Sequence, residues 1–302
     1  MILLIDNGGQ TCNQLWAYAS ALIRSIETGE RICVLAYDKE IVNFPNLLKS
    51  KHFSFPVYSS IMHKCLGIGT YVKIIRRVLR GKHHNFYPFL IWLFRGKYIK
   101  PWDNLYDLNL QKYMDKLKTT FVFSQDIRDY TDFQFLANTK EYDMTVGVHI
   151  RRGDYKYWQC GHYFLEMRQY CWICKNILKM FPNSKLKFFI STNENISTED
   201  WNEIDYFVID QSSAMKDLYG LSKCDMIIGP PSSFSRWAAF IGEKKLCFVQ
   251  DKKQNDFIFK QVVTYGYFAD GSPIWYNLYS EDNPSVGIPN HPNFQNYVND
   301  SI

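Results

Sequence analysis

The sequence lacks a hydrophobic run long enough to cross a membrane. Its most apolar later stretch, Phe86 to Phe94, is shorter than the about 20 residues of a spanning helix, and charged residues flank it. The N-terminal run Met1 to Asp6 lacks the basic region and extended apolar core of a signal peptide. We therefore expect a cytoplasmic protein, in which the eight cysteines are reduced thiols.

Acidic residues are absent from one long segment. Residues 41–102 contain 11 Lys or Arg and no Asp or Glu, so the rest of the chain carries 24 minus 30, or −6, although the whole chain is +5. The basic residues from Lys73 to Lys100 alternate with aromatic ones. This pattern indicates either a solvated face or, over residues 64–100, attraction to an anionic membrane surface or a phosphate-bearing partner. We expect no nucleic-acid partner, because no recognised binding motif accompanies the charge.

A second Cys-x-x-Cys pair is also missing. Cys160, His162, Cys171 and Cys174 have a spacing that would suit four zinc ligands. Residues 163–180 are predicted to be helical, however, and Cys171 and Cys174 then share one apolar face. We favour buried thiols over zinc and predict no metal site.

The remaining composition is that of a globular protein with two domains. The 302 residues are 46% apolar and 22% charged, and no internal repeat is present. A strand at 2–6, a helix at 13–28 and a strand at 32–37 begin an α/β domain, whereas residues 40–140 are predicted to be mostly helical and irregular.

A second run of strands and helices follows from residue 144. We predict strands at 145–150, 186–191, 206–209, 226–228 and 246–249, and helices at 163–180, 215–223 and 233–241, before an irregular tail. The predicted fold is therefore α/β, with domains at residues 1–140 and 141–302. A ligand is expected in the cleft between them, at the carboxyl ends of strands.

Two adjacent arginines follow the strand predicted at 145–150. Arg151 and Arg152 present forked guanidinium donors that suit a diphosphate, and Asp154 is close enough to orient one of them. A surface ion-pair loop would have the same composition, so this cluster alone leaves both interpretations open.

A second phosphate-suited feature follows the strand predicted at 226–228. Ser232 or Ser233 stands at the start of a helix, where the free backbone N–H groups and the helix dipole favour an anion. A serine at this position caps a helix more often than it binds a ligand. Two such features on neighbouring turns of one domain favour the binding of a diphosphate.

These segments carry a family resemblance. The run His149 to Tyr155 is similar to the His-x-Arg-Arg-x-Asp-Tyr signature of bacterial α-1,2-fucosyltransferases, and the run Asp217 to Ser235 resembles their downstream motif. Gly8-Gly9 with Asn13-Gln14 resembles their opening glycine turn, although Thr11-Cys12 stands where the family has one glycine. Arg236 occupies a position where the family usually has Trp.

The resemblance implies a GT-B architecture, in which two Rossmann-like βα domains face a central cleft. Residues 1–140 would form the acceptor side, and residues 141–302 would bind a GDP-sugar. Arg151 would bind the diphosphate with support from Arg152, and His149 and Asp217 would contact the guanosine. The other implied donor-site residues are Asn13, Gln14, Ser232, Ser233 and Phe234.

The resemblance also implies a reaction, the transfer of L-fucose from GDP-fucose to a glycan hydroxyl. The implied target is the 2-OH of galactose, with inversion at the anomeric carbon. The sequence contains no Asp-x-Asp, the motif with which many nucleotide-sugar transferases hold a divalent cation. We therefore expect no metal or other cofactor, and Arg151 would stabilise the departing GDP.

Some of these assignments have alternatives. Asp154 is a hypothetical general base, and an ion pair with an arginine is an equal alternative for it. A transferase of another GDP-sugar or linkage, and a non-catalytic binding protein of the same fold, stay open as alternative functions. The expected acceptor is a glycan or lipid-linked oligosaccharide, for an enzyme in the cytoplasm or at the inner membrane.

Overall fold

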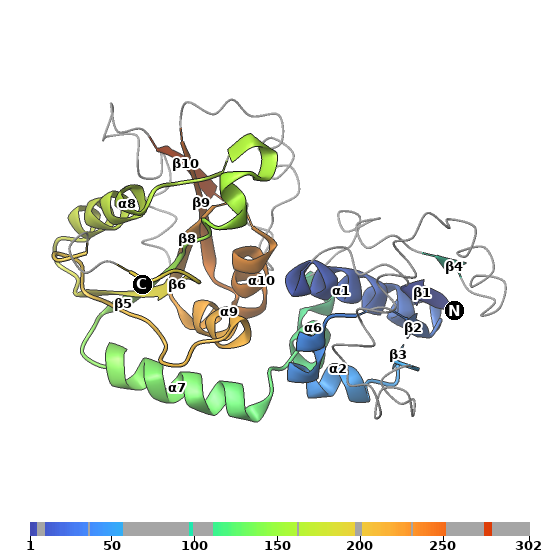
Figure 1. The fold of residues 1–302 in the computed structure, drawn as a ribbon. Coiled ribbons are helices and arrows are strands. Elements are labelled where there is room, and N and C mark those ends of the chain that lie inside the picture. Colours follow the sequence, from blue (N-terminus) through green and yellow to red (C-terminus); the bar gives the residue numbers. More distant parts are fainter. Residues whose placement is uncertain are drawn as a thin grey trace. The chain divides into compact units, whose positions relative to one another are not determined.

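The computed structural model describes residues 1–4, 10–35, 37–56, 97–98, 111–161, 163–196, 201–230, 232–251 and 275–279. The chain divides into two compact units, Met1–Ser124 and Gln125–Ile302 (Figure 1). The basic segment 64–100 lies outside the described residues except for Lys97 and Tyr98.

The first unit contains a four-stranded parallel sheet. The strands are β1 (Ile2–Leu4), β2 (Ile32–Val34), β3 (Phe53–Ser54) and β4 (Lys97–Tyr98), in the order β3-β2-β1-β4. Helix α1 (Thr11–Thr28) joins β1 to β2 and buries one face rich in apolar side chains. It ends at Gly29, whose φ of 71° suits a residue without a Cβ. The predicted strand, helix, strand order is confirmed.

Short helices complete the first unit. Asp38 caps the turn η1 (Lys39–Asn43) by accepting from the Glu40 N–H at 3.1 Å, and Pro45 starts α2 (Pro45–Lys49). The turn η2 (Gln111–Tyr113) leads into α6 (Met114–Thr120), whose inner face is buried. In the described part of residues 40–140 the expected helical and irregular character is thus confirmed.

The second unit is built on a six-stranded parallel sheet. Its strands are β5 (Met144–His149), β6 (Leu186–Ser191), β7 (Tyr206–Phe207), β8 (Met226–Gly229), β9 (Lys245–Asp251) and β10 (Trp275–Tyr279). They lie in the order β10-β9-β8-β5-β6-β7. Counted from β5, this is the strand order 3-2-1-4-5-6 of Rossmann folds. The α/β prediction is confirmed.

The prediction of an irregular tail is wrong at one place. Strand β10 pairs in parallel with β9 along its whole length, from Trp275 beside Cys247 to Tyr279 beside Asp251. The segment has no clear apolar alternation in the sequence. Its strand conformation depends on backbone hydrogen bonds to the neighbouring strand β9.

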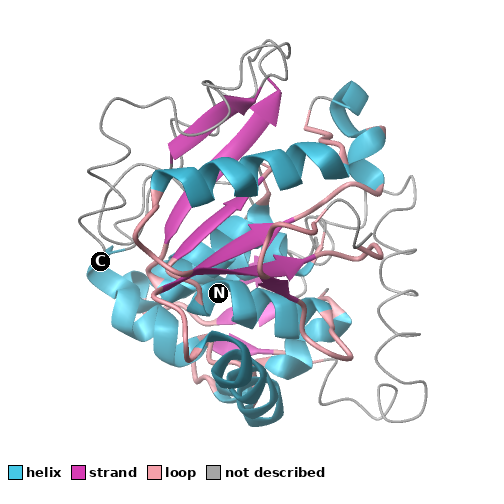
Figure 2. Ribbon diagram, turned by 90° about the vertical axis from the view of Figure 1, so that its left-hand side faces the viewer, coloured by secondary structure: helices cyan, strands magenta, loops and turns pink. Residues whose placement is uncertain are grey.

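Helices cover both faces of this sheet (Figures 1 and 2). Helix α8 (Met167–Met180) packs on one face, in a core shared with Val146, Phe188 and Ile228. Helices α7 (Gln125–Thr139), α9 (Ala214–Lys223) and α10 (Ser233–Gly242) cover the other. Gly147 there faces Leu221 and Cys224 so closely that a Cβ would lie 2.8 Å from the leucine methyl.

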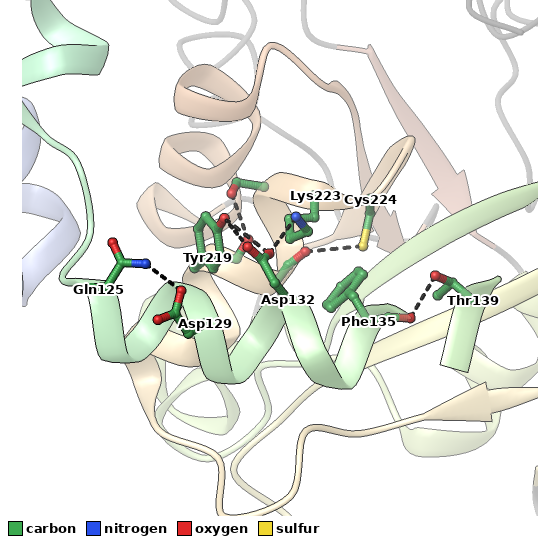
Figure 3. A network of polar contacts seen from close by, with 10 residues as sticks. Gln125, Asp129, Asp132, Phe135, Thr139, Tyr219, Lys223 and Cys224 are labelled. Carbon is green, nitrogen blue, oxygen red and sulfur yellow. Dashed lines mark hydrogen bonds and ion pairs between the residues drawn. The ribbon is translucent and has the colours of Figure 1, made fainter. Parts of the chain in front are cut away.

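Helix α7 belongs to the second unit because it packs on α9. Asp132 of α7 accepts a hydrogen bond from the Tyr219 hydroxyl at 3.2 Å and pairs with Lys223 Nζ at 2.6 Å (Figure 3). Phe135 of the same helix meets the Phe189 ring of the sheet at 5.1 Å. The division of the chain therefore falls after Ser124, ahead of the boundary predicted at residue 140.

Cys171 and Cys174 are buried on the inner face of α8 as thiols outside any disulfide, as predicted. The side chain of Cys160 and all of His162 lie outside the described residues. The helix begins at Met167, later than predicted, because Glu166 and Gln169 form a capping box that fixes its first turn. Of the described helices, none is long and apolar enough to cross a membrane.

Candidate functional site

The connections of the second unit change direction between β5 and β8, and the carboxyl ends of these two strands are where an open α/β sheet has its ligand crevice. The connection after β5 leads to α8 on one face of the sheet, whereas the connection after β8 leads to α10 on the other. In open α/β sheets, ligands bind at the carboxyl ends of the strands where the connections diverge in this way. The residues that follow β5 and β8 are those that the sequence singles out, the Arg151 cluster and the Ser232 helix start.

Arg151 is held in one orientation by Asp154. Its Nε and Nη2 groups donate to the two carboxylate oxygens at 3.0 and 2.7 Å. The guanidinium also lies 5.0 Å from the centre of the Tyr155 ring. The bidentate pair and the ring together fix the plane of the guanidinium. The Arg151 side chain is 23% exposed and that of Asp154 is 58% exposed.

Asp154 is a poor candidate for a proton acceptor at neutral pH. The hydrogen bond from Arg151 holds the pKa of this carboxyl below its usual range, against the opposing effect of partial burial. A general base works best when its pKa lies near the operating pH. The geometry therefore favours the ion-pair alternative for Asp154.

Arg152 turns to two acidic partners from other segments. Its Nη1 donates to Glu194 at 2.8 Å and its Nη2 to Glu166 at 2.9 Å, and its guanidinium lies 5.3 Å from the Phe164 ring. Glu166 is the residue that caps α8, and Glu194 follows β6. Arg152 thus ties together the loops that follow β5 and β6.

His149 is buried at the end of β5, on the face that α10 covers. Its ring lies 5.0 Å from that of Phe234. Burial, with the nearby charge of Arg151, lowers its pKa to about 3, so the imidazole is neutral at physiological pH. Its Nδ1 is buried without a hydrogen-bond partner among the described residues.

Asp217, in the first turn of α9, reaches the end of β6, the strand next to the one that carries His149. Its Oδ2 accepts from Ser191 at 3.1 Å and its Oδ1 from Ser212, and Ser191 pairs with His149 in the sheet. Burial raises the pKa of Asp217 to about 6, although the two hydroxyl donors oppose the shift. A carboxylate at this depth is suited to accept from N–H groups of a bound ligand.

The start of α10 closes the other side of the crevice. Ser232 caps the helix by accepting from the Phe234 N–H at 3.2 Å, so its hydroxyl serves as an N-cap. Burial raises the pKa of Tyr155, whereas the charge of Arg151 and a hydrogen bond with Ser232 lower it. Tyr155 therefore lies next to both Arg151 and Ser232. Ser233 is the first helical residue. Gly229 is required here, because a Cβ would lie 2.8 Å from the His149 carbonyl oxygen.

Asn13 and Gln14 lie in the first turns of α1, in the first unit. Gln14 is buried, and its Oε1 accepts from the Asp38 N–H at 2.7 Å and the Tyr18 hydroxyl at 3.1 Å. These bonds give Gln14 a structural role within its own unit. The preceding glycines, Gly8 and Gly9, lie outside the described residues.

The sequence model of glycosyl transferase family 11 matches residues 109–268, more than half of the chain. The chain belongs to this family. The matched segment contains both the β5 and the β8 side of the crevice, so the fucosyltransferase resemblance noted in the sequence is confirmed at the level of the family. A sequence search of curated proteins found no match to this family 11 enzyme.

Solved structures of fucosyltransferases are similar to the chain. The fucosyltransferase NodZ from Bradyrhizobium is 15% identical with a TM-score of 0.46, over 80% of this chain and 92% of the other. A mutant of Arabidopsis thaliana FUT1 in complex with GDP is 13% identical with a TM-score of 0.48, over 81% and 69%. POFUT1 in complex with GDP is 10% identical with a TM-score of 0.47, over 82% and 97%. At these values the likeness supports no conclusion about this chain.

The sequence did not predict three residues that hydrogen-bond to predicted site residues: Ser191 bonds to Asp217, and Glu166 and Glu194 bond to Arg152. Ser191 stands at the carboxyl end of a predicted strand, a position that marks it as a site residue once the neighbouring strand is known. Glu166 and Glu194 carry no motif, because their role depends only on which loops meet at Arg152.

Proposed function

We propose that this family 11 glycosyltransferase transfers L-fucose from GDP-fucose to a hydroxyl of a glycan or lipid-linked oligosaccharide, with the 2-OH of galactose as the target. The observation that carries the proposal is Arg151. A forked cation, fixed by a bidentate carboxylate and placed at the β5–β8 crevice beside a helix start, is suited to a nucleotide diphosphate.

The reaction needs charge stabilisation at the diphosphate. As the bond between fucose and GDP breaks, negative charge grows on the β-phosphate, and a preorganised guanidinium stabilises it without reorganising. Arg151 would supply that charge, while the backbone N–H groups of Ser232 and Ser233 at the start of α10 would bind phosphate oxygens. The acceptor hydroxyl then attacks the face opposite GDP, which inverts the anomeric carbon and gives an α-fucoside from a β-linked donor.

The same crevice offers groups for the guanosine. Asp217, when ionised, would accept from the guanine N1–H and N2–H groups, and neutral His149 would contact the nucleoside. Phe234 lies against His149 and helps to hold its ring. The assignment of Asn13 and Gln14 to the donor site stays a prediction from the resemblance.

We propose a reaction without a general base of ordinary strength and without a divalent cation. The lowered pKa of Asp154 supports the first point, and the lack of an Asp-x-Asp motif supports the second. Departure of GDP from the donor leaves an oxocarbenium-like fucosyl group, an electrophile that a hydroxyl can attack with little prior deprotonation. The hydroxyl loses its proton to solvent as the new C–O bond forms.

A GDP-release assay across a panel of galactosides tests the proposal. GDP-fucose with a β-galactoside acceptor should release GDP, and turnover should persist in excess EDTA. The H1–H2 coupling of the product's fucose should show the α configuration, and a long-range correlation across the glycosidic bond should place it at O2 of galactose. Release from GDP-mannose but not GDP-fucose would replace the donor, and a requirement for Mg²⁺ or Mn²⁺ would overturn the metal-free mechanism. Affinity for GDP by calorimetry without any turnover would mark a non-catalytic binding protein.

A further inference from the structure

An exposed pair of aromatic side chains follows the Arg151 segment. Tyr157 is 79% exposed, and Trp158, at the start of the turn η4 (Trp158–Gly161), is 42% exposed. Large aromatic side chains are mostly withdrawn from water, so two adjacent exposed ones that follow a ligand-binding segment in the chain are a candidate contact surface. Neither residue has a part in the donor site described above.

Trp158 is exposed but rigidly supported. Its ring stacks on Tyr155 at 4.9 Å with an interplanar angle of 26°, and it meets Tyr163 at 5.2 Å. Both tyrosines are buried. The indole is therefore fixed by buried rings from one side, and a fixed flat surface loses little conformational entropy when a ligand stacks on it.

The same tyrosine connects this surface to the proposed reaction centre. The Arg151 guanidinium lies 5.0 Å from the Tyr155 ring, and the Trp158 ring lies 4.9 Å from that ring. Trp158 is thus within two ring spacings of the group that would hold the diphosphate. In a transfer reaction, the acceptor must approach the sugar carbon attached to that diphosphate, so its neighbouring sugar residues fall within this range.

We propose that Trp158 forms an acceptor subsite, an aromatic platform on which a sugar ring of the glycan stacks through its C–H face, and that the exposed Tyr157, its neighbour in the chain, makes a second and weaker contact. The proposal rests on the proposed function, because only a glycan acceptor requires a sugar-binding surface here. A guanine base is a weaker fit, since the side chains that offer hydrogen bonds to a base edge come from β6 and α9, at Ser191 and Asp217. The platform adds an acceptor contact to the second unit, which the resemblance assigns to the donor.

Steady-state kinetics of platform variants test this subsite. With GDP-fucose saturating and lactose or a galactose-terminated tetrasaccharide varied, Trp158→Ala should raise the acceptor KM by about two- to tenfold, the range of one aromatic contact. Trp158→Phe should recover most of the loss, because a smaller ring still stacks. Tyr157→Ala should give a smaller rise. The matched control is Phe133→Ala on α7, an exposed aromatic residue (67%) outside the site, which should behave as the wild type.

Two further measurements distinguish an acceptor subsite from a donor-binding role of Trp158 and from a failure of the proposed function. Calorimetry with GDP shows whether each variant is folded. A Trp158→Ala variant that loses GDP affinity but keeps acceptor affinity would place the guanine base or the donor sugar on the platform and would overturn the acceptor subsite. Titration of the wild type and Trp158→Ala with the tetrasaccharide in the presence of GDP measures glycan binding without turnover. Weaker binding by the variant supports the platform even if GDP-fucose proves not to be the donor, and equal acceptor KM and binding in both proteins would refute it.

Discussion

At the residue scale, the site depends on how neighbouring groups set charge. Arg151 is fixed by Asp154 and lies on Tyr155, whereas Arg152, one residue later, is occupied by Glu166 and Glu194. Two adjacent arginines thus have different tasks, because successive side chains leave the chain in different directions and meet different loops. The first is suited to a ligand and the second to holding the loops in place.

Replacement of Arg151 should therefore remove most of the activity. Arg151→Ala should lower kcat for GDP release by about a hundredfold or more, and Arg151→Lys should do nearly as much harm, because an ammonium cannot form the fork. Asp154→Asn should cost less than about tenfold, because this exposed carboxylate only orients its partner. An exposed arginine of α8, Arg168, provides the matched control as Arg168→Ala. Arginine variants with wild-type turnover would contradict the proposed role of Arg151.

Asp217 should give nucleotide binding a dependence on pH. Its pKa of about 6 means that the carboxylate becomes protonated as the pH falls through 6 and loses its ability to accept from guanine. GDP affinity should fall from pH 8 to pH 5 in the wild type. Asp217→Asn should bind GDP weakly over this whole pH range. Any dependence of its GDP affinity on pH that remains measures the titration of the terminal phosphate of GDP, whose pKa also lies near 6. Parallel slopes in the two proteins, by calorimetry, would exclude this carboxylate from recognition.

Asp217→Asn should lower GDP affinity without lowering the free energy of unfolding. Because the folded pKa of Asp217 is raised, the folded state binds its proton more tightly, and this contribution to stability is lost as the pH rises through about 6. At pH 8 the wild type buries an ionised carboxylate that Asp217→Asn does not. Urea denaturation at pH 8 should therefore show that the variant is no less stable than the wild type, while its GDP affinity is reduced. A large loss of stability would assign Asp217 a structural role instead.

At the element scale, glycines determine how closely α9 and α10 approach their neighbours. A Cβ at Gly242, the last residue of α10, would lie 2.2 Å from the Ser222 carbonyl oxygen of α9. A Cβ at Gly220 of α9 would lie 2.8 Å from the ring of Phe189. The first contact is with backbone, which cannot move without displacing a helix, whereas the second is with a side chain.

Substitution at these two glycines should therefore have graded effects. Gly220→Ala should lower the free energy of unfolding by about 1–3 kcal/mol, the range found for overpacked cores, and Gly242→Ala should lower it by more. Urea denaturation of both variants and the wild type, followed by circular dichroism, measures the difference. Equal stabilities of Gly242→Ala and the wild type would show that α9 and α10 lie further apart than described here.

At the scale of the whole molecule, positive charge is concentrated in residues 41–102, which contain 11 Lys or Arg and no acidic residue. The basic segment 64–100 lies almost entirely outside the described residues. Peripheral contact of this segment with an anionic membrane stays a prediction from the sequence. It would bring the enzyme to acceptors carried on lipid.

Vesicle sedimentation tests this contact. The chain should bind vesicles rich in anionic lipid at about 0.1 M salt and should release them at about 1 M, where the Debye length falls to about 3 Å. Exchange of Arg76, Arg77 and Arg80 for Gln should weaken binding, whereas the same exchange at the exposed Lys39, Lys116 and Lys140 should have less effect. Binding that ignores salt, or equal loss in both variants, would count against a specific basic surface.

The sequence by itself determined the local elements and the family. Helix periodicity, the turn glycines and the two phosphate-suited motifs depend on neighbours in the chain, so they were readable without a fold. The resemblance at His149 to Tyr155 and Asp217 to Ser235 was confirmed as membership of family 11. The roles of the individual site residues stay predictions.

Only the tertiary structure decided which of these residues meet. The strand order places β5 beside β8, and so brings the Arg151 loop to the start of α10, although Arg151 and Ser232 are 81 positions apart in the sequence. It also buries Asp217 against Ser191, gives Arg152 its acidic partners and makes a strand of Trp275 to Tyr279. The physical reason is that parallel strands pair through backbone groups that every residue carries, so the partner of a strand is set by the packing of the whole unit and not by its own side chains.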